Sequence, residues 1–277
     1  MRRTRGGAGA FSWVFKSLAA IAAAACFAAC ATSPTGRKQA MVVDDAQMAS
    51  LGQQSFEQIK QQTPIERDPK INEFVRCVAV PITKQVPGVV PNDQWEIVVF
   101  KDKTANAFAL PGGKIGVNTG MLPVAKTDAQ LAAVLGHEIG HVLAKHSAER
   151  MSENVLAEGG LSILGGVLGG NPNQGTIMGA LGVGAQYGLL LPHSRDQESE
   201  ADVIGLDLMA KAGFDPRQSV ELWKNMMSSS SGAPPEFLST HPSNQSRIDG
   251  LEAKMGAAVP TYEQARAAGQ KPSCPHP

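Results

Sequence analysis

Residues 127–150 read TDAQLAAVLGHEIGHVLAKHSAER and contain the pentapeptide HEIGH. Thr127, followed three residues later by Gln130, is a typical helix start, because the two side chains can cap the first turn. Apolar residues recur at helical spacing behind it, namely Leu131, Leu135, Ile139 and Val142. At about 100° per residue, His137 and His141 lie together roughly opposite these apolar residues. We therefore expect one helix that buries one face in a core and presents two imidazoles to a cleft.

The pentapeptide follows the pattern HExxH, which indicates a zinc site. Two histidines four residues apart on a helix can bind one zinc ion, and Glu138 between them is placed to activate water. A helix with two chance histidines is the competing interpretation, so the rest of the chain has to supply a further ligand. His146 is not expected to do so, because on a continuous helix it lies about 180° round from His137.

A catalytic zinc site of this kind takes three protein ligands and leaves its fourth position open. The pattern HExxHxxGxxH would supply a third histidine, but Ala144 and Ser147 stand at its glycine and its last histidine. The third ligand must therefore come from another element.

The segment ESEAD at residues 198–202 offers a carboxylate on a second helix. Glu198 and Asp202 lie four residues apart and share a face of that helix, whereas the glutamate between them points elsewhere. The small Gly205 would let this helix approach the HExxH helix closely. Alone, such a segment is usually a solvated acidic face. After an HExxH helix, we predict that Glu198 is the third ligand and that Asp202 orients His137.

Four ordered motifs resemble the HtpX and CAAX-prenyl-protease family of zinc metallopeptidases, peptidase family M48. They are NAFALPGG, HEIGH, SRDQESEAD and STHPSNQSRI, and the likeness covers roughly residues 44–251. The resemblance implies a mainly helical, gluzincin-like α+β domain with a small β-sheet at the rim of the cleft. It also implies that His137, His141 and Glu198 bind the metal and that Glu138 is the general base.

The resemblance also covers three positions outside this ligand set. His241, in the HP motif, approaches the metal in this family, either to stabilise the oxyanion or as a removable fourth ligand that restrains activity. The simpler interpretation is a loop histidine before a proline. Asn106 and Arg247 match positions near the substrate cleft.

The N-terminus looks like an export signal. Three arginines among the first five residues precede an apolar run, and FAAC, ending at Cys30, resembles a bacterial lipobox. We expect residues 1–29 to be a lipoprotein signal peptide and residues 30–43 a tether after lipidated Cys30. An ordinary signal peptide and an uncleaved anchor are the alternatives. The predicted localisation is the bacterial cell envelope, as an outer-membrane lipoprotein that faces the periplasm and is held to the membrane by its lipid.

The remaining chain divides unevenly. Residues 44–258 are expected to form the metallopeptidase domain, and residues 259–277 a loosely ordered tail.

Cys77 and Cys274 remain as a pair, and a disulfide and two free thiols are equally compatible with the sequence. Residues 155–192 are rich in glycine and poor in charge. A buried helical hairpin, a mobile flap and a membrane-surface element compete there, and we favour a mobile element near the active site.

Strand-like residues precede the HExxH helix. Residues 95–100, WEIVVF, and 114–119 have the composition of strands, and a Pro-Gly-Gly turn comes before the second of them. An open strand edge at this place could receive an extended peptide by main-chain pairing. The simpler alternative is a hairpin that only completes the sheet.

The 25 basic and 25 acidic residues balance without a concentrated basic face, which argues against a nucleic-acid partner. We predict a metalloendopeptidase with one zinc ion per chain that cleaves misfolded or unassembled periplasmic and outer-membrane proteins in extended form, as protein quality control. The main alternative is a latent or inactive metalloprotease-fold chaperone or assembly factor for outer-membrane proteins. A hydrolase of another envelope polymer, such as peptidoglycan, is the second. The oligomeric state stays open, and an oligomer is compatible with the sequence.

Overall fold

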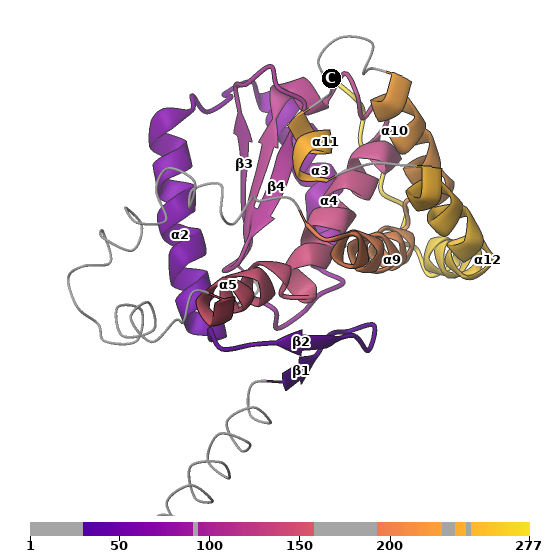
Figure 1. The fold of residues 1–277 in the computed structure, drawn as a ribbon. Helices are drawn as coiled ribbons and strands as arrows, with labels where there is room; N and C mark the ends of the chain where they lie inside the picture. The colour runs from indigo at the N-terminus through magenta and orange to yellow at the C-terminus, as the bar shows by residue number, and fades with distance from the viewer. Residues whose placement is uncertain (1–29, 91–93, 158–192, 229–235, 242–244) are drawn as a thin grey trace, which may run out of the picture.

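A small mixed β-sheet lies among helices in the computed structural model (Figure 1). The described residues are 30–90, 94–157, 193–228, 236–241 and 245–277. The sheet has the order β3-β5-β4, formed by Glu96–Phe100, Lys114–Asn118 and Ala107–Leu110. β3 pairs with β5 in parallel, and β4 pairs with β5 antiparallel. β4 is therefore an edge strand of this sheet.

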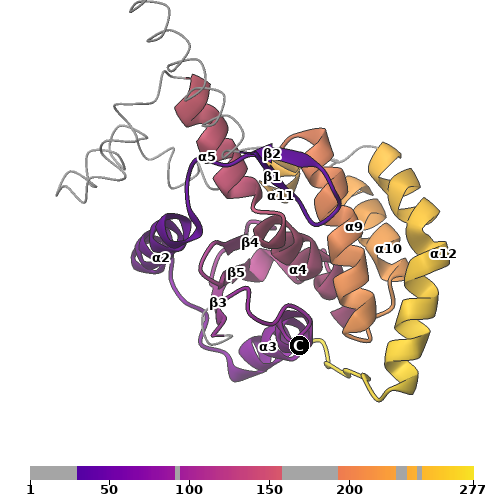
Figure 2. The same cartoon turned by 90° about the horizontal axis from the view of Figure 1, so that it is seen from below.

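Helices cover both faces of the sheet (Figure 2). α2 lies on one face, and α3 and α4 lie on the other; their bounds are Asp45–Gln62, Pro69–Thr83 and Asp128–Leu143. A short 3₁₀ helix, η2, spans Thr119–Met121 between β5 and α4. Beyond α4 lie α9, α10 and α12, with bounds Arg195–Lys211, Arg217–Ser228 and Gln245–Ala267. The short α11, Glu236–Thr240, lies near β4 and α4 in Figure 1.

Successive strand residues face two different apolar clusters, as the two-residue period of a strand requires. Phe100, Phe108 and Leu110 pack with Phe56 of α2. Their neighbours Val99, Ala107 and Ala109 join the larger cluster, which also holds the buried residues of α3 and α4. The sheet is thus covered by apolar side chains on both faces, and α4 is held firmly against one of them.

The predicted fold class is confirmed: the domain is a mainly helical α+β structure with a small sheet. The HExxH helix, however, is shorter than the continuous helix assumed for His146. α4 ends at Leu143, and Lys145 adopts a left-handed conformation with φ of 55°. A separate helix, α5, then spans His146–Ala157. The change of direction at Lys145 invalidates the angle predicted for His146.

The prediction of a tether at residues 30–43 is also wrong in part, because these residues include two β-strands. Two short strands, β1 at Cys30–Thr32 and β2 at Lys38–Ala40, pair antiparallel as a hairpin, with Cys30 opposite Ala40. Val43 follows the hairpin and is buried in the cluster around α2. The lipidation of Cys30 stays a prediction.

Residues 259–277 do not form the expected loose tail. α12 runs through Pro260 to Ala267, and a disulfide joins Cys77 to Cys274. This covalent bond ties the end of the chain to α3, which composition alone could not show.

Two sequence predictions fall outside the described residues. One is the signal peptide at residues 1–29. The other is the glycine-rich segment at 155–192, of which only the first three residues, at the end of α5, are described. Among the helices of the described stretches, none combines the length and the apolar character that a membrane crossing requires.

Candidate metal centre

Helix α4 begins with the predicted cap, although only half of the reciprocal pair forms. The Thr127 hydroxyl accepts a hydrogen bond from the Gln130 backbone N–H at 3.2 Å, while the Gln130 side chain accepts from Lys126 N–H at 2.8 Å. Residues 129–141 are all buried, because α4 lies between the sheet on one side and α9 on the other. The face expected to line an open cleft is therefore covered by other elements.

Two glycines let α4 and α9 approach closely. A Cβ on Gly136 would lie 2.7 Å from the Gly205 carbonyl oxygen, and one on Gly205 would lie 2.6 Å from the His137 backbone nitrogen. Real Cβ atoms do not approach backbone atoms so closely, so both positions exclude larger residues. This contact brings the carboxylates of α9 to the histidines of α4.

Four side chains gather their donor atoms where these helices meet. His137, His141, Glu198 and His241 are all buried, and one donor atom from each lies within 4.8 Å of the others. His137 Nε2 lies 3.0 Å from His141 Nε2 and 3.2 Å from His241 Nδ1. Glu198 Oε1 lies 3.4 Å from His141 Nε2 and 2.9 Å from His241 Nδ1. The three predicted ligands and the HP-motif histidine thus converge on one point.

This donor set fits a zinc ion. Tetrahedral zinc with bonds of about 2.0–2.1 Å separates its donors by about 3.3 Å, close to the distances observed here. Imidazole nitrogens and a carboxylate oxygen are also donors that zinc accepts. The residues that are present therefore match the metal expected from HExxH.

The charge balance among these groups favours an ionised carboxylate. Burial alone would raise the pKa of Glu198, but the imidazoles of His137 and His241 face it and lower that pKa far below its usual range. Burial would likewise lower the pKa of His137, but Glu198 and Asp202 raise it to about 9. A metal ion has to displace this proton, so metal affinity is expected to fall as the pH falls.

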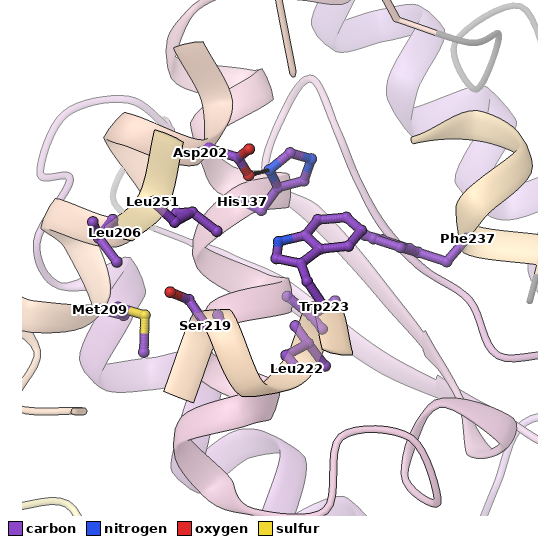
Figure 3. A pocket seen from close by; sticks show the side chains of 12 residues that line it. His137, Asp202, Leu206, Met209, Ser219, Leu222, Trp223, Phe237 and Leu251 are labelled. Atoms are coloured by element: carbon purple, nitrogen blue, oxygen red, sulfur yellow. Dashed lines mark ion pairs between the residues drawn. The ribbon is translucent and has the colours of Figure 1, made fainter. Parts of the chain in front are cut away.

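Asp202 lies where the sequence predicts it, against His137. Its Oδ1 is 3.0 Å from His137 Nδ1, the ion pair drawn as a dashed line in Figure 3. When Nδ1–H donates to this carboxylate, the lone pair on Nε2 faces the other donors. Trp223 and Phe237 flank the same imidazole, with ring centroids 6.2 Å away in each case.

Arg247 lies beside the ligands, and a role of its side chain toward substrate stays a prediction. Its side chain is buried behind the ligands, where it donates to Asp202 at 2.6 and 2.7 Å and to Glu198 at 2.6 Å. Its guanidinium also lies over the Trp223 ring, 3.9 Å from the centroid. The family motif located this residue correctly near the site, but its burial shows that it balances two carboxylates.

Glu138 lies on the other side of the donor set. Its Oε1 is 3.3 Å from His241 Nε2 without the geometry of a hydrogen bond, and among the described residues this buried oxygen has no hydrogen-bond partner. Burial raises the pKa of Glu138, while a hydrogen bond from the Ala109 backbone lowers it by a smaller amount. A carboxylate with a raised pKa, one oxygen of which accepts no hydrogen bond from the described residues, is suited to accept a proton from water.

The outer edge of β4 runs beside Glu138. The Asn106 carbonyl accepts from Asn118 N–H at 3.0 Å, so the backbone of Asn106 faces β5. Because backbone direction alternates along a strand, the N–H and C=O groups of Ala107 and Ala109 face the outer edge. The Ala109 hydrogen bond to Glu138 agrees with this arrangement. A role of the Asn106 side chain toward substrate stays a prediction.

His146 and Glu200 belong to the site, although the sequence interpretation set both aside. His141 Nδ1 lies 2.8 Å from His146 Nδ1, and His146 Nε2 lies 3.2 Å from Glu200 Oε2. Burial lowers the pKa of His146 to about 4, so its imidazole is neutral at pH 7. The missing signal was the helix end, since Lys145 holds the left-handed position that glycine or asparagine usually marks.

Comparison with known proteins agrees with this geometry. Residues 66–255 match the profile of peptidase family M48. The mitochondrial metalloendopeptidase OMA1 of Schizosaccharomyces pombe is 41% identical over 168 residues, which are 57% of this chain and 46% of that protein. Human OMA1 is 32% identical over 83% of this chain and 46% of its own length. The beta-barrel assembly-enhancing protease of Escherichia coli K12 is 26% identical over 73% and 42%. The chain thus spans about half the length of these relatives.

These relatives overturn the predicted localisation. Those matched at 41%, 39% and 40% identity are all mitochondrial by name, which contradicts a bacterial outer-membrane lipoprotein facing the periplasm. The composition of the N-terminal residues does not distinguish a bacterial signal peptide from a mitochondrial transit peptide. Residues 1–43 contain several arginines and no acidic residue, and mitochondrial transit peptides share that composition.

Proposed function

This chain belongs to peptidase family M48, and from that premise we propose that it is a zinc-dependent endopeptidase. The observation that carries the proposal is the convergence of His137, His141 and Glu198 beside the buried carboxylate of Glu138. Such a set provides metal ligands and a proton acceptor within one site.

The residues of the chain divide the chemical work. When bound by His137, His141 and Glu198, zinc supplies a Lewis acid that polarises the scissile carbonyl. Glu138 accepts a proton from the attacking water and passes it to the leaving amine. Its raised pKa supports this role, because the protonated form is easier to reach than for a solvated glutamate.

The proposed substrate is a polypeptide in extended form. An extended peptide can add to the outer edge of β4, where the N–H and C=O of Ala107 and the C=O of Ala109 face away from β5 while the Ala109 N–H meets Glu138. Main-chain pairing is insensitive to sequence, and a folded protein does not present a free strand. Misfolded or unassembled proteins therefore suit this edge best, in keeping with a role in protein quality control.

A second candidate function follows from His241. Its Nδ1 lies among the ligand atoms, so the site holds four protein donors, which is the number found in closed, structural zinc sites. A closed site would make the chain a latent protease, or a binding protein for unfolded chains without turnover. Removal of His241 separates the latent state from a permanently inactive one.

The test measures bound zinc and the cleavage of unfolded casein by the purified chain. We expect one zinc ion per chain in the wild type. Glu138→Gln should retain zinc and lose activity by roughly 10²–10⁴-fold, because only the proton acceptor is removed. Glu57→Gln makes the same change on the exposed side of α2 and serves as the matched control.

His241→Ala decides between the two candidate functions. Faster cleavage with unchanged zinc content would show that His241 holds the enzyme latent. Zinc without cleavage in every variant would favour the binding protein. Unchanged cleavage in Glu138→Gln would refute the proposed mechanism, and absence of zinc from all variants would refute the metal site.

A further inference from the structure

We propose that Arg37, Glu200 and His146 are positioning residues that orient the ligand His141 and thereby set the metal affinity of the site. The inference rests on the proposed metal site and extends it to the N-terminal hairpin. It rests on hydrogen bonds and ion pairs that join the hairpin to His141 through two intermediate side chains.

The direction of each hydrogen bond follows from metal binding. When His141 Nε2 offers its lone pair to a metal, Nδ1 carries the hydrogen and donates to His146 Nδ1, 2.8 Å away. Because His146 Nδ1 accepts this hydrogen bond, the hydrogen of the His146 ring lies on Nε2, which donates to Glu200 Oε2 at 3.2 Å. Every donor in this series of hydrogen bonds meets an acceptor. With Nε2 of His141 on the metal, only the tautomer with its hydrogen on Nδ1 completes the series.

Glu200 is held in place by the turn of the hairpin. The Thr35 hydroxyl donates to Glu200 Oε1 at 2.6 Å, and Arg37 Nε donates to Glu200 Oε2 at 2.9 Å. The carboxylate is buried, although the sequence predicted only that Glu200 points away from the face shared by Glu198 and Asp202. Without the hairpin, the Glu200 carboxylate would lose both contacts, and Oε2, the oxygen that accepts from His146, would lose its contact with Arg37.

Arg37 is itself anchored between two helices. Its terminal nitrogens donate to both oxygens of Glu149 on α5, one of them at 2.6 Å, while its Nε reaches Glu200 on α9. Gln197 of α9 also donates to Glu149 at 2.8 Å. Gln39 of β2 donates to the Ala144 carbonyl at the end of α4 at 2.7 Å. Figures 1 and 2 show the hairpin beside α5 and α9, so it joins the three elements that meet at His141.

The two histidines of the HExxH motif therefore have parallel supports. His137 meets the carboxylate of Asp202 directly, and that carboxylate is paired with Arg247. His141 reaches a carboxylate through one additional imidazole, and that carboxylate is paired with Arg37. A carboxylate paired with an arginine therefore supports each histidine, directly for His137 and through His146 for His141. Because the second pair matches the first, we interpret the Arg37–Glu200 pair as part of the metal site and not as a chance surface ion pair.

The experiment measures the zinc dissociation constant of the full chain by competition with a chromophoric chelator. His146→Leu removes the acceptor of His141 Nδ1–H and should weaken zinc binding roughly 10–100-fold. His146→Asn should recover part of the loss, because its Oδ1 takes the place of Nδ1 as the acceptor. Arg37→Ala should give a smaller weakening, and the exposed hairpin variant Lys38→Ala none.

Two further readouts separate positioning from general stability. The visible spectrum of the Co²⁺-loaded chain should change in His146→Leu, because the ligand imidazole reorients, and should recover in part in His146→Asn. Phe56→Leu, in the apolar cluster around α2, should lower the Tm and leave zinc affinity unchanged. If it weakens zinc binding as much as Arg37→Ala at equal loss of Tm, the hairpin acts only through stability and the inference fails.

Other outcomes also overturn the inference. A wild-type zinc affinity in His146→Leu would refute the positioning role while leaving the proposed function intact. Two ions in the wild type and one in His146→Leu, with unchanged affinity of that ion, would indicate instead a second metal held by His141, His146 and His193, whose ring nitrogens also cluster. Failure of the wild type to bind zinc would refute the proposed function itself.

Discussion

The two sides of helix α4 are held together by different chemistry. Toward the sheet the contacts are apolar, and beyond it α2 adds an aromatic cluster in which Phe56, Phe100 and Phe108 lie with ring centroids 6.0–6.3 Å apart. Toward α9, Gly136 and Gly205 bring the two helices into close contact, which we call the glycine seam. Buried ionised groups, among them Glu198 and Arg247, lie beside it. The sheet side therefore supplies stability without charge, while the α9 side holds charges that are costly to bury. We expect stability and metal binding to respond to different substitutions.

The largest stability effect is expected on the sheet side. Phe56→Ala should lower the free energy of unfolding by about 3–5 kcal/mol, because a fully buried aromatic side chain is replaced by a cavity. The zinc dissociation constant should not change, since the aromatic cluster shares no charged group with the site. Urea denaturation and chelator competition on the same samples test both statements. A parallel loss of zinc affinity would break the separation between the two sides.

A smaller effect is expected at the glycine seam, but there both properties should change. Gly205→Ala should lower the free energy of unfolding by about 1–3 kcal/mol, because the added Cβ meets backbone atoms of α4 that cannot move alone. It should also weaken zinc binding, since α9 carries Glu198. Gly250→Ala is the matched control, because its Cβ meets no atom within 4 Å. That control should stabilise the helix by about 0.5–1 kcal/mol.

The smallest effect concerns an ion-pair cluster at the edge of the sheet. Burial raises the pKa of Glu96, but Lys60 and Lys114 together lower it by a larger amount. The pKa of Glu96 in the folded chain is therefore below its usual value. The folded pKa is below the unfolded one, so this stabilisation is present above about pH 4.5 and is lost as the pH falls through the folded value. Glu96→Gln should cost about 0.2–1 kcal/mol at pH 7, because the carboxylate is partly exposed.

The measurement is the Tm of wild type and Glu96→Gln from pH 7 downward. The difference between the two chains should shrink on acidification. A difference in favour of the wild type that grows at low pH would show that folding raises the pKa of Glu96, and would refute the stabilising role assigned to the two lysines.

How much the sequence could predict depends on how local each contact is. The pairing of His137 with His141 follows from one helical turn, and their spacing alone predicts it. Glu198 is distant in sequence, but its motif resembles that of a known family and its place in the fold agrees with that resemblance. Both predictions depend on regular helices that the chain does form.

The predictions that failed depend on where regular structure ends. Lys145 reverses the chain without a glycine, so His146 moves to the site instead of away from it. The hairpin at residues 30–40 owes its place to Arg37, whose partners lie on α5 and α9, so no local pattern could predict it. The ordered end of the chain likewise depends on a covalent partner at Cys77.

That covalent bond bears on what happens when a protease cuts itself. The disulfide closes a ring between positions 77 and 274, and every proposed ligand lies within it. A single nick inside the ring would leave both pieces attached to each other, even when it separates the histidines of α4 from the glutamate of α9. Such a nick would create new chain ends without releasing a fragment. Damage of this kind would go unnoticed in electrophoresis until a reductant was added, so the integrity of the enzyme has to be judged under reducing conditions.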